Sequence, residues 1–159
     1  MEIEIRAIVV TVSDTRDIES DRSGETLSEC LMEIGAKIVS RRLIKDDFEV
    51  LKEALADLTD EDINLLVTTG GTGITPRDNT PDATIEILEK EIRGISEAMR
   101  FETLSKTRRA MLSRGVSGIR NNTLVINFPG SPKGVVETFD AIKVVIPHAI
   151  AQLEGYADH

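Results

Sequence analysis

The sequence predicts an α/β fold, a three-layer α/β/α sandwich around a mostly parallel sheet with one antiparallel strand pair. Runs of β-branched and aliphatic residues alternate with segments whose apolar residues recur at helical spacing. Polar or glycine-rich turns follow the strand-like runs, as expected where parallel strands deliver their loops to one edge of a sheet.

The composition sets limits on the class of protein. The chain has 159 residues, the size of one domain, and we expect residues 1–159 to form one. Hydrophobic residues make up 40% and aromatic residues 3%, so the core is expected to be aliphatic. No apolar run is long enough to span a bilayer, no signal-peptide pattern occurs, and a single cysteine, Cys30, excludes an internal disulfide. We therefore expect a soluble, cytoplasmic protein with no membrane partner.

The first half of the chain is expected to hold three strands, at residues 5–13, 36–43 and 63–69. The first is nearly continuous and β-branched, which predicts a strand covered on both faces. The second is less apolar and is therefore placed nearer an edge. Ser23 or Gly24 is expected to cap the first helix, which ends at Gly35. Asp47 is expected to cap the second.

The next helix is expected to begin with Thr80 as N-cap and Pro81 at the first helical position. Its expected buried face consists of Ile85, Leu88 and Ile92. Gly94 then separates it from a further helical stretch.

Two strands and one long helix are predicted for the end of the chain. The strands at 116–120 and 124–128 are joined by a tight turn at Asn121-Asn122, which makes them an antiparallel pair. A helix then begins near Ser131 and carries apolar residues at helical spacing as far as Leu153, with a kink expected at Pro147.

Residues 69–84, TGGTGITPRDNTPDAT, join the third strand to the following helix. Glycine allows a positive φ and lets backbone N–H groups approach an anion without side chains in between. The helix N-terminus adds the positive end of a dipole. Because neither GxxxxGK[ST] nor GxGxxG occurs here, the two usual nucleotide-loop fingerprints do not apply. The stretch predicts an anion site of another kind.

The formal net charge of −9 argues against nucleic acid as a partner, because binding to nucleic acid needs a basic face. An acidic protein that binds a polyanion needs backbone donors, a local basic patch or a divalent ion. Residues 100–120 hold six basic residues and one acidic residue, which fits a basic patch or an ordinary solvated surface equally well. Lys133 is placed near a helix N-terminus, where an anion would offset the unfavourable dipole.

Four polar segments follow predicted strands: Ser13-Asp14, Asp46, residues 70–78 and residues 129–133. The ends of parallel strands meet at one edge, which would gather carboxylates, backbone donors and cations. Such a set suits metal-assisted phosphoryl or nucleotidyl transfer, with Mg²⁺ held by one or two carboxylates and by phosphate oxygens. Each aspartate also has a structural interpretation. Asp78 could form a loop ion pair or an Asx turn, and Asp46 could cap a helix.

The stretch at 69–84 resembles the signature of the molybdenum cofactor biosynthesis MoaB/Mog family. The resemblance continues in order through VSDT at 12–15, IKD at 44–46, GISE at 94–97, SR at 113–114 and LVINFPGSPK at 124–133. The long string is highly specific, and the shorter ones gain their weight from their order. The SDTR start at 13–16 and the single compact domain look more like the MoaB branch than the Mog branch.

The resemblance implies a molybdopterin adenylyltransferase. Proteins of this family transfer the adenylyl group of ATP to the terminal phosphate of molybdopterin in the presence of Mg²⁺ and release pyrophosphate. The resemblance also implies a homotrimer or homohexamer and a hand-over of product to a metal-insertion protein.

The same resemblance assigns the site residues. The family's two essential aspartates fall on Asp46 and Asp78, which are expected to act in catalysis and to bind Mg²⁺. Phosphate and nucleotide contacts are expected from Ser13, Asp14, Thr69, Gly70, Gly71, Thr72, Gly73, Pro129, Gly130, Ser131 and Lys133. Glu97 and Arg100 are expected on the pterin side.

Two other functions are compatible with parts of this pattern. A molybdopterin-binding or scaffold protein of the same pathway would not need both aspartates, so the presence of Asp46 and Asp78 favours the enzyme. A CinA-like nucleotide hydrolase shares the fold but carries a GGLGPT-type loop, whereas this chain has GGTGITPRD at 70–78.

Overall fold

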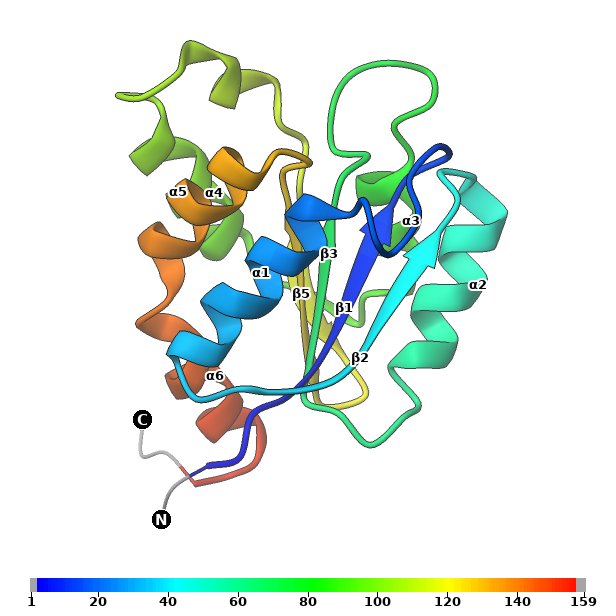
Figure 1. Cartoon of the computed structure of the whole chain (residues 1–159). Helices are drawn as coiled ribbons and strands as arrows, with labels where there is room; N and C mark the ends of the chain where they lie inside the picture. Colours follow the sequence, from blue (N-terminus) through cyan, green and yellow to red (C-terminus); the bar gives the residue numbers. More distant parts are fainter. Residues whose placement is uncertain (1–2, 157–159) are drawn as a thin grey trace.

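A computed structural model describes residues 3–156. Six strands form one sheet in the order β2-β1-β3-β6-β5-β4 (Figure 1). They are β1 Arg6–Val12, β2 Lys37–Ile44, β3 Leu65–Thr69, β4 Lys90–Glu91, β5 Ser117–Arg120 and β6 Thr123–Phe128. β1 runs parallel to β2 and β3, and β3 runs parallel to β6. β5 is antiparallel to β6, as predicted, and the short β4 adds a second antiparallel pairing with β5.

Helices cover both faces of the sheet. They are α1 Arg22–Glu33, α2 Phe48–Leu58, α3 Thr80–Ile87, α4 Arg93–Thr103, the 3₁₀ helix η1 Arg108–Leu112, α5 Pro132–Ile142 and α6 Val145–Leu153. Figure 1 shows α1, α4, α5 and α6 on one side and α2 and α3 on the other. The predicted three-layer α/β/α sandwich with a mostly parallel sheet is therefore confirmed. None of the helices in the described part of the chain is long and apolar enough to cross a membrane.

The alternation of side chains along β1 builds two cores. Ala7 and Val9 face the larger core, beneath α1, α4, α5 and α6, whereas Ile8 and Val10 face the smaller core, beneath α2 and α3. All four are completely buried, as expected of a central parallel strand that is covered on both faces. β2 lies at the edge of the sheet, as its lower apolar content predicts.

The cap of α1 differs from the prediction. Asp21, rather than Ser23 or Gly24, caps the helix, and its Oδ1 accepts a hydrogen bond of 2.9 Å from the Gly24 N–H. Ser23 and Gly24 are the second and third helical residues. Asp47 caps α2 as predicted, through a 3.0 Å hydrogen bond from the Val50 N–H.

The α3 region is shorter than its apolar spacing predicts. The prediction of its start was wrong by one residue: Asn79, not Thr80, occupies the N-cap position, and Pro81 is the second helical residue. The helix ends at Ile87, and β4 then adds to the sheet through hydrogen bonds from Glu89 N to Ile119 O (2.9 Å) and from Ile92 N to Ser117 O (2.8 Å). The predicted buried face was wrong at Ile85, which is 42% exposed. The backbone of residues 89–92 thus forms hydrogen bonds with β5 instead of continuing the helix.

Two other boundary predictions were also wrong. Gly94 is the second residue of α4 and does not separate two helices. The predicted final helix is two helices, α5 and α6, which are separated by Lys143 and Val144. Pro147 is the third residue of α6, where the missing N–H has no intrahelical partner to lose, so no kink arises. The turn at Asn121-Asn122 is as predicted, with φ of 48° and 59°.

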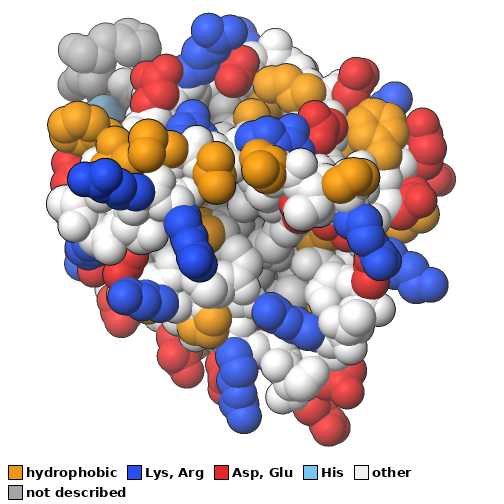
Figure 2. Space-filling view, turned by 90° about the horizontal axis from the view of Figure 1, so that it is seen from above, with side chains coloured by type: hydrophobic (Ala, Val, Ile, Leu, Met, Phe, Trp, Pro, Cys, Tyr) orange, Lys and Arg blue, Asp and Glu red, His pale blue; other side chains and the backbone are white. Residues whose placement is uncertain are grey.

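The parallel strands β1, β2, β3 and β6 all end at the upper edge in Figure 1. Figure 2 looks down on this edge and shows Lys and Arg side chains around a hollow near the centre. The fold thus brings together the loops at residues 13–16, 45–47, 70–79 and 129–131.

Candidate functional site

The glycine loop (residues 70–78) begins in a turn that only glycine fits. Gly70 has a φ of 99° and Gly71 a φ of 67°, and a Cβ on Gly70 would lie 2.6 Å from the carbonyl oxygen of Val12 at the end of β1. A Cβ on Gly130, in the turn after β6, would lie 3.3 Å from the Gly70 Cα. The two glycine turns are therefore packed against each other at the centre of the edge.

The glycine loop retains several backbone donors. Gly70 N donates to Phe128 O at 3.2 Å. Among the described residues, the N–H groups of Gly71, Thr72 and Gly73 make no hydrogen bond. Three consecutive N–H groups are thus left for a ligand, as in other backbone anion sites.

Asp46 reaches the glycine loop from the end of β2. Its Oδ1 accepts a 3.0 Å hydrogen bond from Asn79 N, and its own N–H donates to Asp14 Oδ1 at 3.0 Å. A Cβ on Gly71 would stand 2.7 Å from Asp46 Oδ2. Burial raises the pKa of Asp46 above its usual range, and the nearby charges of Asp78 and Asp14 add to this rise, while the hydrogen bonds from Asn79 oppose it.

Asp78 lies against the same loop at Gly73, two residues after Gly71. A Cβ on Gly73 would lie 2.8 Å from Asp78 Oδ2. That oxygen accepts hydrogen bonds from Thr75 N (2.9 Å) and Thr75 Oγ1 (2.8 Å). The structural interpretation of Asp78, a turn within the loop, thus accounts for one carboxylate oxygen. Asp46 lies against Gly71 and Asp78 against Gly73, so both carboxylates belong to one glycine-rich segment rather than to separate regions.

The loop after β1 closes the site from the other side. The Asp14 carboxylate pairs with Arg77 of the glycine loop. The hydrogen bond from Asp46 N lowers the pKa of Asp14, and the guanidinium of Arg77 lowers it further. Ser13 Oγ accepts from Thr15 N (3.2 Å) and Arg16 N (3.1 Å), so Ser13 holds the turn that presents Asp14.

Thr80 is a residue that the sequence reasoning placed in a structural role only. Its side chain is buried, and its Oγ1 has no hydrogen-bond partner among the described residues. A Cβ on Gly71 would stand 2.3 Å from that oxygen. The hydroxyl therefore faces the same small space as the Asp46 carboxylate. No sequence signal separates this threonine from an ordinary helix-start threonine.

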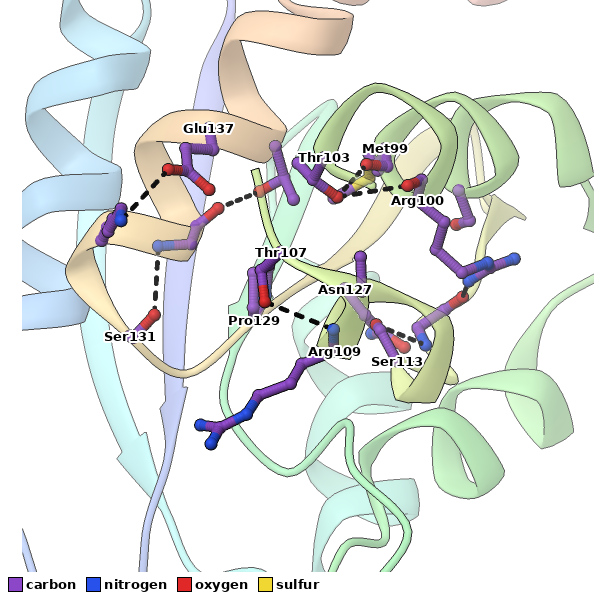
Figure 3. Close-up of a pocket in the computed structure, with 16 residues that line it drawn as sticks. Met99, Arg100, Thr103, Thr107, Arg109, Ser113, Asn127, Pro129, Ser131 and Glu137 are labelled. Carbon is purple, nitrogen blue, oxygen red and sulfur yellow. Dashed lines mark hydrogen bonds and ion pairs between the residues drawn. The ribbon is translucent and has the colours of Figure 1, made fainter. Parts of the chain in front are cut away.

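A cavity of about 380 Å³ lies between α4 and α5; we call it the α4–α5 pocket. In Figure 3, Ser131 and Glu137 face it from α5 and the preceding turn, Met99 and Arg100 belong to α4, and Ser113 follows η1. Its size lies within the range of small-molecule sites. Arg100, which was expected on the pterin side, lines the pocket, and so do Pro129, Ser131 and Lys133, which were expected to contact phosphate or nucleotide. Glu97 is exposed and does not line it.

The polar groups of the pocket are only partly committed to the fold. Ser131 Oγ caps α5 through a 3.0 Å hydrogen bond from Gly134 N. Lys133 Nζ lies 3.9 Å from Glu137 Oε1, and the Lys133 side chain is 83% exposed. Arg100 Nη1 donates to Gly115 O at 2.9 Å. Thr69 Oγ1 donates to Pro129 O at 2.6 Å and ties the end of β3 to the pocket turn.

The basic residues at 100–120 do not form one patch. Arg120 donates to Thr59 Oγ1 and to Ile87 O, both at 3.1 Å, near the opposite edge of the sheet. Lys106, Arg108 and Arg109 are exposed. Figure 3 shows the Arg109 side chain extending away from Met99 and Arg100. Only part of the cluster therefore belongs to the pocket.

A protein-family model described as "Probable molybdopterin binding domain" matches residues 8–148 of the chain. The chain belongs to this family. The matched segment includes both aspartates, the glycine loop and the α4–α5 pocket. The resemblance to MoaB and Mog proteins that the sequence motifs indicated is thereby confirmed.

Relatives of this molybdopterin-binding domain include enzymes and longer proteins. The molybdopterin adenylyltransferase of Helicobacter pylori (strain ATCC 700392 / 26695) is 36% identical over 152 residues, which is 92% of this chain and 86% of that protein. The molybdenum cofactor synthesis protein cinnamon of Drosophila melanogaster is 40% identical over 146 residues, or 89% of this chain. The chain spans only 24% of that relative.

The crystal structure of the molybdopterin biosynthesis enzyme MoaB from Thermus thermophilus has the same fold. It superposes with a TM-score of 0.87 at 39% sequence identity, over 95% of this chain and 97% of that one. The fold described above is thus that of a solved family member.

Proposed function

We propose that this protein is a molybdopterin adenylyltransferase of molybdenum cofactor biosynthesis. It would transfer the adenylyl group of ATP to the terminal phosphate of molybdopterin and release pyrophosphate. The observation that carries the proposal is the placement of Asp46 and Asp78 over Gly71 and Gly73, next to a pocket of about 380 Å³. Beside them are three backbone N–H groups that have no partner within residues 3–156. The 36% identical H. pylori relative with this activity supports it.

The residues around Gly71 fit a divalent cation. Thr80 Oγ1 is a buried oxygen without a partner among the described residues, and it faces the same space as Asp46 Oδ2. Oxygen ligands of this kind are those that Mg²⁺ prefers, with phosphate oxygens and water completing the shell. Asp46 and Asp78 would hold the ion. When bound, Mg²⁺ neutralises the charge of the phosphates and of the leaving pyrophosphate.

The chain's own groups would position the reacting phosphates. The N–H groups of residues 71–73 donate to no acceptor in the described part of the chain. They are therefore free to bind phosphate oxygens, and they add no negative charge to the site. The Asp14–Arg77 pair joins the loop after β1 to the glycine loop. This pair would restrict how far the two loops separate around a nucleotide.

The α4–α5 pocket would hold the pterin. Met99 and Pro129 offer apolar surface, and Ser113 and Ser131 offer hydroxyl groups. Lys133 provides an exposed ammonium group at the pocket edge. Pro129 and Ser131 of the pocket flank Gly130, which packs against Gly70 of the glycine loop. A phosphate that extends from the pocket past this contact would therefore reach a nucleotide on the glycine loop.

A molybdopterin-binding or scaffold protein with little catalysis is the second candidate. Asp78 Oδ2 is already occupied by two hydrogen bonds from Thr75, which a purely structural aspartate would also show. In a scaffold protein, holding this turn would be the whole role of Asp78.

Incubation of the protein with ATP, Mg²⁺ and molybdopterin separates the candidates. Adenylylated molybdopterin together with pyrophosphate supports the transferase. Binding of molybdopterin without product supports the scaffold, and hydrolysis of ATP alone would indicate a nucleotide hydrolase. Omission of Mg²⁺ is the matched control, because the proposal requires that product formation stop without it.

Three further properties stay predictions for the whole chain, residues 1–159. We expect a cytoplasmic location, a homotrimer or homohexamer, and hand-over of the product to a metal-insertion protein. The apolar residues of α5 and α6 are mostly used in the protein's own core, and Val136, Val144 and Val145 are the apolar residues of this region that are exposed. Sedimentation of the purified protein would test the oligomer, and a hand-over partner would have to be sought separately.

A further inference from the structure

Arg114 makes an unusual set of hydrogen bonds to the glycine loop. It lies between η1 and β5, and its backbone N donates to Thr72 O at 2.9 Å. Its side chain reaches the same loop at two more points. Nε donates to Gly73 O at 2.8 Å, and Nη2 donates to Asp78 O at 2.9 Å. One residue thus holds both ends of the segment from Gly73 to Asp78.

Asp82 fixes the orientation of the Arg114 guanidinium. Nη1 and Nη2 donate to the two oxygens of the Asp82 carboxylate, each at 3.1 Å. Such a planar, bidentate pair holds a guanidinium more firmly than a single contact would. Asp82 lies in the first turn of α3, so the pair also fixes the loop relative to the helix that carries Thr80.

The neighbours of Arg114 belong to the other half of the site. Ser113 and Gly115 both line the α4–α5 pocket, and Gly115 O accepts the hydrogen bond from Arg100. The backbone of Arg114 is therefore held by the pocket wall, while its side chain holds the glycine loop. Among residues 3–156, Arg114 is the one whose side chain donates to the carbonyls of both Gly73 and Asp78. It thereby joins the α4–α5 pocket to the glycine loop.

We propose that Arg114 is a positioning residue, which keeps the Asp78 carboxylate over Gly73 by clamping the carbonyls of both residues. The inference rests on the proposed function and deepens it. Without the clamp, the loop closed by Asp78 and Thr75 would still form locally but would lose its fixed place relative to Asp46. Lysine cannot replace arginine here, because one ammonium group cannot reach two carbonyls and a carboxylate in the planar arrangement.

The chain offers a matched control in Arg120. It is also partly buried, and it also donates to a backbone carbonyl, that of Ile87 (3.1 Å), and to a side-chain oxygen, Thr59 Oγ1 (3.1 Å). It lies near the opposite edge of the sheet. Arg120→Lys therefore removes comparable structural bonds without touching the glycine loop.

The experiment compares the full-length protein with Arg114→Lys and Arg120→Lys. Amide hydrogen exchange of Asn79, whose N–H donates to Asp46 Oδ1 at 3.0 Å, reports the place of the loop relative to Asp46 without any ligand. Titration with a non-hydrolysable ATP analogue and Mg²⁺ reports nucleotide binding, and steady-state assays separate KM for ATP from kcat. We expect Arg114→Lys to speed exchange at Asn79 and to weaken analogue binding about tenfold, with KM for ATP raised to match. We expect Arg120→Lys to change neither.

Each outcome decides the inference. Unchanged exchange and analogue affinity in Arg114→Lys would overturn it, as would equal effects in Arg120→Lys. If the wild-type protein binds no nucleotide, the proposed function fails, and the exchange data alone still decide whether Arg114 positions the loop. If Arg114→Lys does not fold, Asp82→Asn takes its place, because it releases the guanidinium while leaving it present. Unchanged exchange in Asp82→Asn would then count against the clamp.

Discussion

The Asp46 carboxylate stands directly over the main chain of Gly71, with Oδ2 2.7 Å from the point where a Cβ of residue 71 would lie. Real Cβ atoms do not approach an oxygen so closely. No side chain therefore fits at position 71 beside this carboxylate, and Thr80 Oγ1 lies against the same point.

Gly71→Ala tests the close approach of Asp46 and Thr80 to Gly71 directly. The new methyl group would meet Asp46 Oδ2 and Thr80 Oγ1, and the positive φ of 67° would add strain of about 1–2 kcal/mol. We expect turnover to be lost while a folded protein remains. Gly35→Ala is the control, because Gly35 has a φ of 83° but nothing within 4 Å of its Cβ position. It should show the strain alone, in thermal unfolding, with full turnover. Equal turnover in both variants would contradict the account.

Asp46→Asn should separate function from stability. Because burial raises its pKa, the folded state binds the Asp46 proton more tightly than the unfolded chain does. The ionised side chain therefore opposes folding increasingly as the pH rises above its ordinary value of 3.8. Removing it should leave the free energy of unfolding at pH 7 unchanged or higher, while turnover falls by about 100-fold or more. Thermal unfolding and product assays at pH 7 measure both. A large loss of stability would indicate a helix cap instead.

Mn²⁺ titrations extend the test of Asp46 to metal binding. The ion competes with the proton for the carboxylate. On acidification, a carboxylate with a raised pKa is protonated at a higher pH than an ordinary aspartate. The affinity for Mn²⁺ should therefore begin to fall at that higher pH. This part of the pH dependence should disappear in Asp46→Asn.

Asp21 should make stability depend on pH in the opposite sense. Burial alone would raise its pKa, but hydrogen bonds from Thr11, Gly24 and Arg41 outweigh burial and lower it. The stabilisation is thus fully present above the ordinary value of 3.8 and is lost as the pH falls through the lower folded pKa. Asp21→Asn should lower the free energy of unfolding at pH 7 by about 2–4 kcal/mol.

Urea unfolding from pH 7 down to pH 3 measures that difference, which should shrink on acidification below the ordinary pKa. Asp17→Asn is the control, since Asp17 also accepts a hydrogen bond from Ser20 N (2.8 Å) but lies on the exposed part of the same loop. It should change stability little. A difference for Asp21→Asn that is the same at all pH values would show that lost packing, not charge, is responsible.

Lys133→Gln should weaken binding of molybdopterin rather than the fold. The ammonium group lies on the first turn of α5 at the pocket and makes one long contact of 3.9 Å, to Glu137. Its removal should reduce affinity for molybdopterin about tenfold, which corresponds to about 1.4 kcal/mol, with the melting temperature unchanged. Lys143→Gln, at the other end of α5 and paired with Asp140 at 3.0 Å, should leave affinity as it is.

The sequence was sufficient for the layers, the strands and the gathering of loops at one edge. Those features follow from β-branched runs, such as that of β1, and from the chirality and spacing of parallel strands. The boundaries that were missed depend on competition between elements. At Leu88 the chain leaves the helix to pair with β5. The close approach of the two strands is possible because residue 118 is glycine: a Cβ there would lie 2.3 Å from Lys90 O. No local pattern reports such a partner.

The site was predictable only where the motifs carried it. The glycine loop and its two aspartates stand out in the sequence, and their loops do meet. Arg114 looked like one member of a basic cluster, because its contacts with Gly73 and Asp78 lie about forty residues away in the chain. Asp21 looked like an ordinary loop residue, and its buried pairing with Arg41 depends on the packing of α1 against β2.

The most direct test is the amount of adenylylated molybdopterin formed from ATP and Mg²⁺ by the wild-type protein and by Asp78→Asn. Asparagine can still accept the hydrogen bonds from Thr75, so the loop should fold normally, and Asp60→Asn at the opposite edge of the sheet controls for the same chemical change. We expect product from the wild type and from Asp60→Asn, and at least about 100-fold less from Asp78→Asn at an unchanged melting temperature. Equal product from Asp78→Asn and the wild type would contradict the account.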